Sequence, residues 1–163
     1  MEKRRLGRTG LEVTVVGFGG APIGREGVTH EEAMETVWAS LEGGINLIDT
    51  SPHYGLGRSE RRIGEALRSR PNLAEGVILS TKTGHYGDEK DYSYDRTLRS
   101  VENSLQALGV DHLAIVHIHD VTSAEELEDV VRGKGERRIR RTHNSQPIQP
   151  DRPGGGGNYR KGH

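Results

Sequence analysis

The chain has 163 residues, a formal net charge of −1 and no cysteine. This length is sufficient for one domain with a sizeable core, and the absence of cysteine excludes disulfides, thiolate metal sites and a cysteine nucleophile. No apolar run approaches the ~20 residues of a membrane span. The chain also lacks the apolar segment of a secretory signal near its start, so we expect a soluble cytoplasmic protein without a membrane partner.

Composition divides the chain near residue 132. Residues 1–132 alternate apolar and amphipathic segments and hold 15 Lys and Arg against 22 Asp and Glu, a net charge of −7. Residues 133–163 lack apolar periodicity, hold 8 Lys and Arg against 2 Asp and Glu, and carry +6. Their Pro and Gly content is typical of disorder, so we expect a folded domain over 1–132 and a disordered tail. The tail has one aromatic residue and no repeat, and we expect no nucleic-acid partner.

The first half of the folded part predicts a hairpin followed by alternating strands and helices. Thr9-Gly10 supplies the turn of the hairpin, and Thr29 and Glu32 have the spacing of a capping box that begins a helix. In chain order, the patterns predict a hairpin over 4–13, a buried strand over 15–19, a helix from Thr29 to Gly43-Gly44, a strand over 45–48 and a helix over about 59–69.

The second half continues the same alternation. The patterns predict a strand over 77–80, a polar loop over 83–93, a helix carrying Leu98, Val101, Leu105 and Leu108, a strand over 113–118, and a helix opened by a capping box at Ser123 and Glu126. Strands and helices that alternate at this spacing favour a parallel sheet with covering helices and right-handed crossovers. An open doubly wound sheet and a barrel both fit this order.

Four polar side chains follow three of the predicted strands. Asp49 and Tyr54 come after the strand over 45–48, while Lys82 and His119 come at the ends of the next two strands. In barrels of parallel strands, the chemistry sits at the carboxyl ends, so we expect these groups to converge. Taken singly, three of them have plainer roles: an aspartate that caps a turn, a solvated lysine and a packed tyrosine.

Together these side-chain types suit the reduction of a carbonyl by hydride. A phenol can protonate the developing alkoxide, and a nearby ammonium group assists by stabilising the phenolate. A carboxylate beside the ammonium group holds it in place, and an imidazole that donates a hydrogen bond can aim the carbonyl oxygen. Tyr54, Lys82, Asp49 and His119 are the right types for these four roles.

Further motifs occur in a fixed order over about residues 4–132. They are Gly17-Phe18-Gly19-Gly20, Glu42-Gly43-Gly44-Ile45-Asn46, Asp49-Thr50-Ser51-x-x-Tyr54-Gly55-x-Gly57-x-Ser59-Glu60, Ser80-Thr81-Lys82 and His117-Ile118-His119-Asp120. Together they resemble the aldo-keto reductases. The resemblance implies the N-terminal half of a (β/α)8 barrel, preceded by an N-terminal hairpin.

The resemblance also implies roles for particular residues. Asp49, Tyr54, Lys82 and His119 would form the catalytic tetrad, with Tyr54 as the general acid, and the cofactor would be NADP or NAD without a Rossmann fold. Gly19 and Asp49 are the expected cofactor-binding residues. His53 and His85 lie in predicted loops, and they either line the substrate pocket or are only solvated. The Asp-Thr-Ser-Pro-His-Tyr-Gly form resembles a branch of sugar dehydrogenases, acting on L-fucose, D-threo-aldoses or L-galactose, and of pyridoxal 4-dehydrogenase. There Tyr54 would act as a base in the oxidation of a sugar lactol or an alcohol.

Two alternatives stay open. A complete barrel of this type needs eight strands and ~250 residues, so the tail over 133–163 is interpreted as a frameshifted or truncated continuation. A half-barrel would expose sheet edges, and the alternative to an enzyme is an inactive fragment that associates with itself or with another chain. His117 and His119 also share one side of a strand. Because no third ligand is evident, we expect no metal there and interpret His117 as a core histidine.

Overall fold

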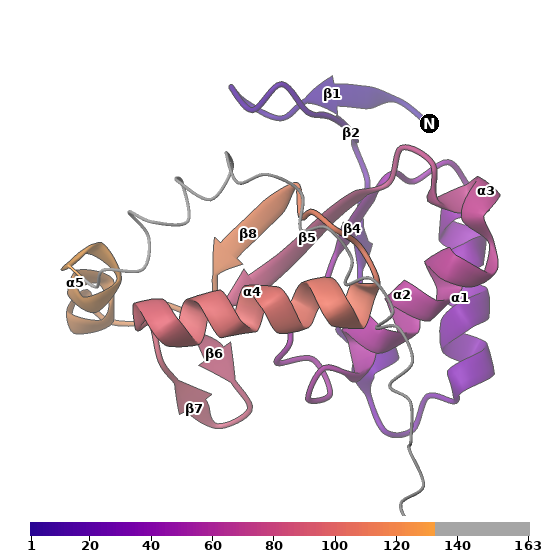
Figure 1. The fold of residues 1–163 in the computed structure, drawn as a ribbon. Coiled ribbons are helices and arrows are strands. Elements are labelled where there is room, and N and C mark those ends of the chain that lie inside the picture. The colour runs from indigo at the N-terminus through magenta and orange to yellow at the C-terminus, as the bar shows by residue number, and fades with distance from the viewer. Residues whose placement is uncertain (133–163) are drawn as a thin grey trace, which may run out of the picture.

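The computed structural model describes residues 1–132, so the predicted tail over 133–163 lies outside the described residues (Figure 1). The strands are β1 (Lys3–Arg5), β2 (Glu12–Thr14), β3 (Phe18–Gly19), β4 (Leu47–Asp49), β5 (Ile78–Thr83), β6 (His85–Tyr86), β7 (Glu89–Lys90) and β8 (Ile115–Ile118). The helices are α1 (His30–Glu42), α2 (Arg58–Ser69), α3 (Pro71–Ala74), α4 (Tyr94–Leu108) and α5 (Ala124–Arg132), with a 3-10 turn over Pro22–Gly24. The predicted alternation of strands and helices is confirmed.

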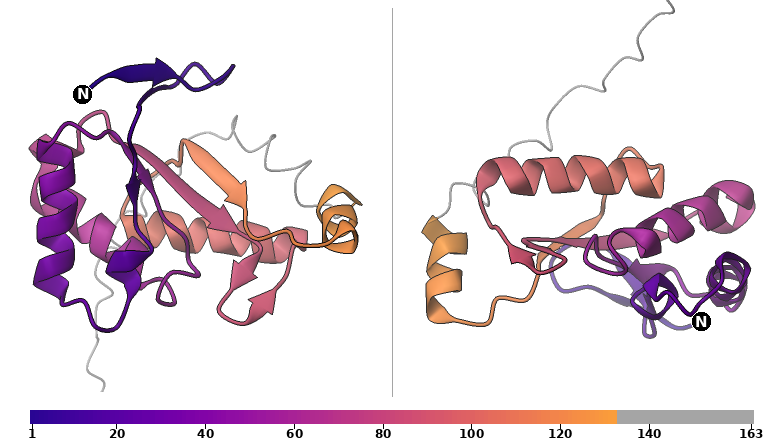
Figure 2. Two further views of the ribbon diagram at one scale, coloured as in Figure 1. Left: turned by 180° about the vertical axis from the view of Figure 1, so that it is seen from behind. Right: turned by 90° about the horizontal axis from the view of Figure 1, so that it is seen from below.

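The central sheet contains four parallel strands in the order β3-β4-β5-β8, so each strand lies beside the next one along the chain. Because parallel crossovers are right-handed, an order that always advances in one direction places α1, α2 and α4 on one face (Figure 2). A doubly wound sheet would instead reverse its strand order at a switch point. The described part of the chain therefore has the arrangement of a barrel segment.

The hydrophobic core lies between the sheet and these helices. Ile48 from the sheet, Val37 from α1, Ile63 from α2 and Leu108 from α4 are completely buried in one cluster. Gly64 allows α2 to approach the end of α4 closely, because a Cβ atom there would stand 2.5 Å from the carbonyl oxygen of Ala107. The core thus packs the sheet against the helices. The polar residues lie at the carboxyl edge of the sheet, where the carboxyl ends of its parallel strands meet.

The helix starts agree with the predicted capping motifs to different degrees. At α1, the Glu32 N–H donates to Thr29 Oγ1 at 3.2 Å and the Thr29 N–H donates to Glu32 Oε2 at 2.8 Å, which is the predicted capping box. At α5, the Glu126 N–H donates to Ser123 Oγ, but the Glu126 carboxylate accepts from the N–H of Thr122. The second capping box is therefore shifted by one residue on its carboxylate side.

Three sequence predictions need correction. Residues 15–19 do not form a buried strand, since only Phe18–Gly19 pairs and Val15 and Val16 are 47% and 54% exposed. In the described chain β3 borders the sheet and pairs on one side only, with β4. The polar loop over 83–93 contains the antiparallel β6–β7 hairpin. His117 is exposed and not a core residue, because it lies on β8 at the other border of the sheet, in register with Lys82.

Within residues 1–132, no helix has the length and apolar character needed to cross a bilayer.

Candidate active site

Asp49 and Lys82 form the polar centre of the carboxyl edge of the sheet. Asp49 ends β4 and Lys82 lies near the end of the adjacent strand β5. The Lys82 ammonium group donates to Asp49 Oδ2 at 2.5 Å and to the carbonyl oxygen of Thr50 at 2.9 Å. Ser80 Oγ donates to the other carboxylate oxygen at 2.8 Å. Because the Lys82 side chain is only 13% exposed, these oxygens supply the compensation that a buried charge requires.

Tyr54 lies in the turn that follows β4, with its ring beside the lysine. Lys82 Nζ is 4.8 Å from the centroid of the Tyr54 ring. The turn is held by close backbone contact, since Gly55 has a φ of 62° and a Cβ atom there would overlap the carbonyl oxygen of Gly24. Only glycine accommodates both the left-handed backbone and this contact. The Tyr54-Gly55 pair thus fixes the position of the phenol.

His119 follows β8 and faces Tyr54 across the same edge. The backbone N–H of His119 donates to the carbonyl oxygen of Thr83 at 2.8 Å, which continues the pairing with β5. The His119 and Tyr54 rings are perpendicular, with centroids 5.8 Å apart. Burial lowers the pKa of His119 to about 4, assisted by the charges of Lys82, His85 and His53. The imidazole is therefore neutral at pH 7.

A hydrogen bond to Ser51 favours one tautomer of this neutral ring. Ser51 Oγ lies 3.2 Å from His119 Nδ1 and already accepts a hydrogen bond from the N–H of His53 at 3.1 Å. This arrangement favours donation by the Ser51 hydroxyl to His119 Nδ1, which leaves the proton of the ring on Nε2. His119 then offers an N–H donor on its other side.

Two further histidines complete the cluster. His53 and His85 stack with ring centroids 4.1 Å apart, and their centroids lie 5.5 and 5.4 Å from that of His119. His53 Nδ1 is buried without a hydrogen-bond partner among residues 1–132. Over the same range, His, Asp and Glu side chains form no group of three that could hold a metal ion. The structure brings all four predicted catalytic side chains and both predicted pocket histidines together.

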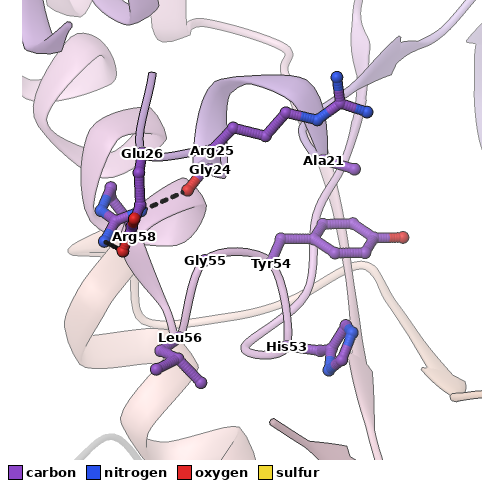
Figure 3. A pocket seen from close by; sticks show the side chains of 9 residues that line it. All are labelled: Ala21, Gly24, Arg25, Glu26, His53, Tyr54, Gly55, Leu56 and Arg58. Carbon is purple, nitrogen blue, oxygen red and sulfur yellow. Dashed lines mark hydrogen bonds and ion pairs between the residues drawn. The ribbon is translucent and has the colours of Figure 1, made fainter. Parts of the chain in front are cut away.

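A cavity of about 310 Å³ opens beside Tyr54 (Figure 3). His53 and Tyr54 line it from one side, and residues 24–26 line it from the other. His85 does not line this cavity. It stacks on the His53 ring, which does. The two predicted pocket residues therefore differ in position, with His53 at the cavity wall and His85 behind it.

Gly19 and Asp49 lie side by side, as parallel register partners of β3 and β4. Gly19 is exposed, and a Cβ atom there would meet no described atom within 4 Å. The adjacent Gly20 N–H donates to the carbonyl oxygen of Asp49 at 2.7 Å, which ties the loop to the strand end. The space against the Gly19 backbone is therefore open beside the strand end that carries Asp49.

Several residues around the site were not predicted from the sequence. Ser51 and Asp120 lie inside the family motifs, and their hydroxyl and carboxylate groups were the available signal. Glu60 is 2% exposed and accepts a hydrogen bond from Thr81 Oγ1 at 2.7 Å, on the strand that carries Lys82. Burial raises the pKa of Glu60. Lys90, in the segment expected to be a loop, had no signal in the sequence.

Comparison with known proteins agrees with this geometry. The profile of the Aldo/keto reductase family matches residues 15–133. L-Galactose dehydrogenase of Arabidopsis thaliana is 39% identical, over 74% of this chain and 39% of that protein. Pyridoxal 4-dehydrogenase of Microbacterium luteolum is 33% identical, over 74% of this chain and 43% of that protein.

Solved structures give the same result. An aldo-keto reductase from Pseudomonas aeruginosa superposes with a TM-score of 0.75 at 34% identity, covering 85% of this chain and 53% of that one. The holo form of an aldo-keto reductase from Bacillus halodurans gives a TM-score of 0.66 at 25% identity, with 83% and 55% covered. The chain spans about two fifths of the length of the curated relatives and about half of the solved chains. The described fold is that of part of an aldo-keto reductase barrel, and the chain belongs to the aldo/keto reductase family.

Proposed function

We propose that this chain supplies the catalytic part of an NAD(P)-dependent oxidoreductase that interconverts a carbonyl and an alcohol. The observation that carries the proposal is the position of Lys82, whose ammonium group contacts Asp49 and lies over the Tyr54 ring. A phenol, an ammonium group, a carboxylate and an imidazole at one sheet edge are the groups that proton transfer to an alkoxide requires.

Tyr54 is the proton donor in the direction of reduction. As the carbonyl oxygen gains charge, the phenol gives up its proton, and Lys82 stabilises the phenolate that remains. Asp49 and the carbonyl oxygen of Thr50 hold the ammonium group in place through the whole step. In the direction of oxidation the same phenolate takes the proton from the alcohol, so one pair of residues serves both directions.

His119 orients the reacting oxygen. Its neutral ring donates from Nε2 to the carbonyl oxygen, and its perpendicular position against Tyr54 directs that oxygen toward the phenol. A neutral donor suits this role, because an imidazolium would compete with Tyr54 as the proton source. Ser51 maintains the donor form of the ring through its contact with Nδ1.

Gly19 and Asp49 are the residues that we assign to the cofactor. When bound, NADP or NAD supplies or accepts the hydride. The exposed backbone of Gly19 and its register partner Asp49 would hold the nicotinamide end of the cofactor. The holo form of the Bacillus halodurans relative is consistent with a nucleotide cofactor in this fold.

The proposed substrate is a sugar lactol or a pyridoxal-like alcohol or aldehyde. Support comes from the relatives named for L-galactose and pyridoxal oxidation. The His53 ring lies at the wall of the cavity beside Tyr54, where it can contact such a molecule. His85 supports that ring from behind by stacking.

The test is a spectrophotometric assay of the purified full chain with NAD or NADP and L-galactose, L-fucose or pyridoxal. We expect reduced cofactor to form with the wild-type chain and turnover to be lost in Tyr54→Phe. Tyr94→Phe, at the first residue of α4, is the matched control and should retain turnover. Equal turnover in Tyr54→Phe and wild type would overturn the assignment of the phenol.

A second candidate function is association through the sheet edges without catalysis. Within residues 1–132, β3 and β8 each pair on one side only, and Val15 and Val16 beside β3 are exposed. Exposed edge strands favour pairing with another chain. Light scattering would show a dimer or larger species, and failure to bind reduced cofactor would favour this candidate over the enzyme. A cofactor-binding monomer would exclude it.

A further inference from the structure

Lys90 at the end of β7 connects the β6–β7 hairpin to the segment after β8. Its ammonium group donates to the carbonyl oxygen of Asp120 at 2.8 Å, to Thr122 Oγ1 at 3.1 Å and to Glu126 Oε1 at 2.9 Å. The Lys90 side chain is 26% exposed, so most of it is enclosed by these partners. One side chain thus joins two segments that are 30 residues apart in sequence.

Asp120 is held in an unusual backbone conformation directly after His119. Its φ is 59°, in the left-handed region that residues other than glycine seldom adopt. The carbonyl oxygen of Asp120 accepts from Lys90 and also from the Tyr92 hydroxyl at 3.4 Å. Such a conformation persists where the surroundings hold it, and here the holding groups come from the hairpin side.

The carboxylate of Asp120 reaches into the histidine cluster. Asp120 Oδ2 lies 3.3 Å from His85 Nδ1 and 3.8 Å from Lys90 Nζ, so the cation and the imidazole share one carboxylate oxygen. His85 in turn stacks on His53 and lies 5.4 Å from His119, centroid to centroid. The contacts form a series from Lys90 through Asp120 to the histidines beside Tyr54.

We propose that Lys90 is a positioning residue that acts through Asp120 to fix the orientation of His85 and to keep a proton on its Nδ1. Asp120 Oδ2 reaches to 3.3 Å from His85 Nδ1 while the Asp120 backbone keeps its left-handed conformation. Lys90 holds the carbonyl oxygen of Asp120 at 2.8 Å and lies 3.8 Å from its carboxylate. That His85 supports the substrate pocket rests on the function proposed above, whereas the state of the His85 ring does not depend on turnover.

The test is a nitrogen NMR measurement of the histidine rings in the full-length, ¹⁵N-labelled chain at fixed pH. We expect His85 Nδ1 in the wild type to show the chemical shift of a protonated nitrogen. Lys90→Met should move this signal toward the unprotonated value, and Lys90→Arg should restore it. Glu89→Gln is the matched control, because Glu89 lies on the same strand and pairs with Arg96 instead.

A second variant separates positioning from general damage to the fold. Asp120→Asn should change the His85 signal as Lys90→Met does, and the double variant should show no further change, because both residues act through one contact. The indole N–H of Trp38, which donates to the carbonyl oxygen of Ala66, reports whether the core is intact. An unchanged His85 signal in folded Lys90→Met or Asp120→Asn would overturn the proposal, as would an unprotonated Nδ1 in the wild type.

This result is distinguishable from failure of the proposed function. A chain without turnover can still show the predicted histidine signals, and that outcome would support the role of Lys90 alone. A chain with turnover whose His85 signal ignores Lys90 would overturn the positioning role and leave the oxidoreductase assignment unchanged.

Discussion

The ammonium group of Lys82 contacts the carboxylate of Asp49 at 2.5 Å, across two neighbouring strands of the sheet. Asp49 ends β4, and its register partner on β5 is Ser80, two residues before Lys82. The Ser80 hydroxyl binds one carboxylate oxygen and the lysine binds the other. The strand pairing itself therefore sets the position of the ammonium group beside Tyr54.

Replacement of Lys82 tests this relationship. In the proposed mechanism, Lys82→Met removes the charge that stabilises the phenolate, and positioned acid–base catalysis contributes about 10²–10⁴-fold to a rate. We expect kcat to fall within that range, while cofactor binding changes less. Steady-state rates of Lys82→Met and of Lys3→Met, a control on the exposed strand β1, provide the comparison. A kcat in Lys82→Met equal to that of the control would contradict the role of the ammonium group.

Ser51→Ala tests the tautomer of His119. Ser51 is completely buried, and its hydroxyl takes part in two hydrogen bonds, with His119 Nδ1 and with the backbone N–H of His53. Loss of each typically costs about 0.5–1.5 kcal/mol of unfolding free energy. Without the hydroxyl donor, the His119 ring is free to adopt either tautomer, so we expect a lower kcat in a chain that still folds. Chemical denaturation and rate measurements on the same preparation separate the two effects. A fully active Ser51→Ala chain would show that the contact does not matter for the reaction.

The pKa of His119 predicts the effect of acid on stability. The folded-state pKa is about 4 against an ordinary value of 6.5, so the unfolded chain binds the proton more readily. The unfolding free energy should therefore fall as the pH drops from about 6.5 toward about 4. Because other carboxyl groups titrate nearby, the measurement is the difference between wild type and His119→Asn in denaturation curves. A difference that stays constant across this range would contradict the lowered pKa.

Glu60 should change the pH dependence of the unfolding free energy in the opposite direction from His119. Burial raises its pKa above the ordinary value of 4.5, so the folded chain binds this proton more readily than the unfolded chain. Its contribution to stability is therefore present at low pH and is lost as the pH rises through the raised pKa. Glu60→Gln should remove this loss, and its unfolding free energy should vary less with pH than that of the wild type. The same pH dependence of the unfolding free energy in Glu60→Gln and the wild type would contradict a raised pKa of Glu60.

Gly55→Ala tests the backbone contact that holds the Tyr54 turn. The added Cβ atom would overlap the carbonyl oxygen of Gly24, and the φ of 62° is unfavourable for alanine. We expect a loss of unfolding free energy greater than ~1 kcal/mol, together with loss of activity. Gly27→Ala is the control, since its Cβ atom would meet nothing within 4 Å. Equal stability of the two variants would show that the turn tolerates a side chain.

Much of the architecture could be predicted because it depends on local patterns. The capping box at Thr29 and Glu32 fixes the start of α1, and the apolar spacing around Ile63 fixes the buried face of α2. The edge on which Asp49 and Lys82 meet follows from the parallel strand order. These features need no knowledge of distant contacts beyond the rule that parallel strands end at the same edge.

The remaining features depend on contacts that no local pattern encodes. Val15 and Val16 have the composition of a strand, yet β3 borders the described sheet and leaves them exposed. The β6–β7 hairpin is a pair of two-residue strands within polar sequence, below the length at which alternation is visible. The role of Lys90 depends on partners around Asp120 that are brought near only by the completed fold.

The most direct test of the account measures cofactor binding and turnover in the same full-length chain, for wild type and Tyr54→Phe. We predict that both chains bind reduced cofactor equally and that only the wild type oxidises or reduces substrate, because the variant lacks the phenolic proton that the proposed mechanism transfers. Turnover in Tyr54→Phe at the wild-type rate would contradict it.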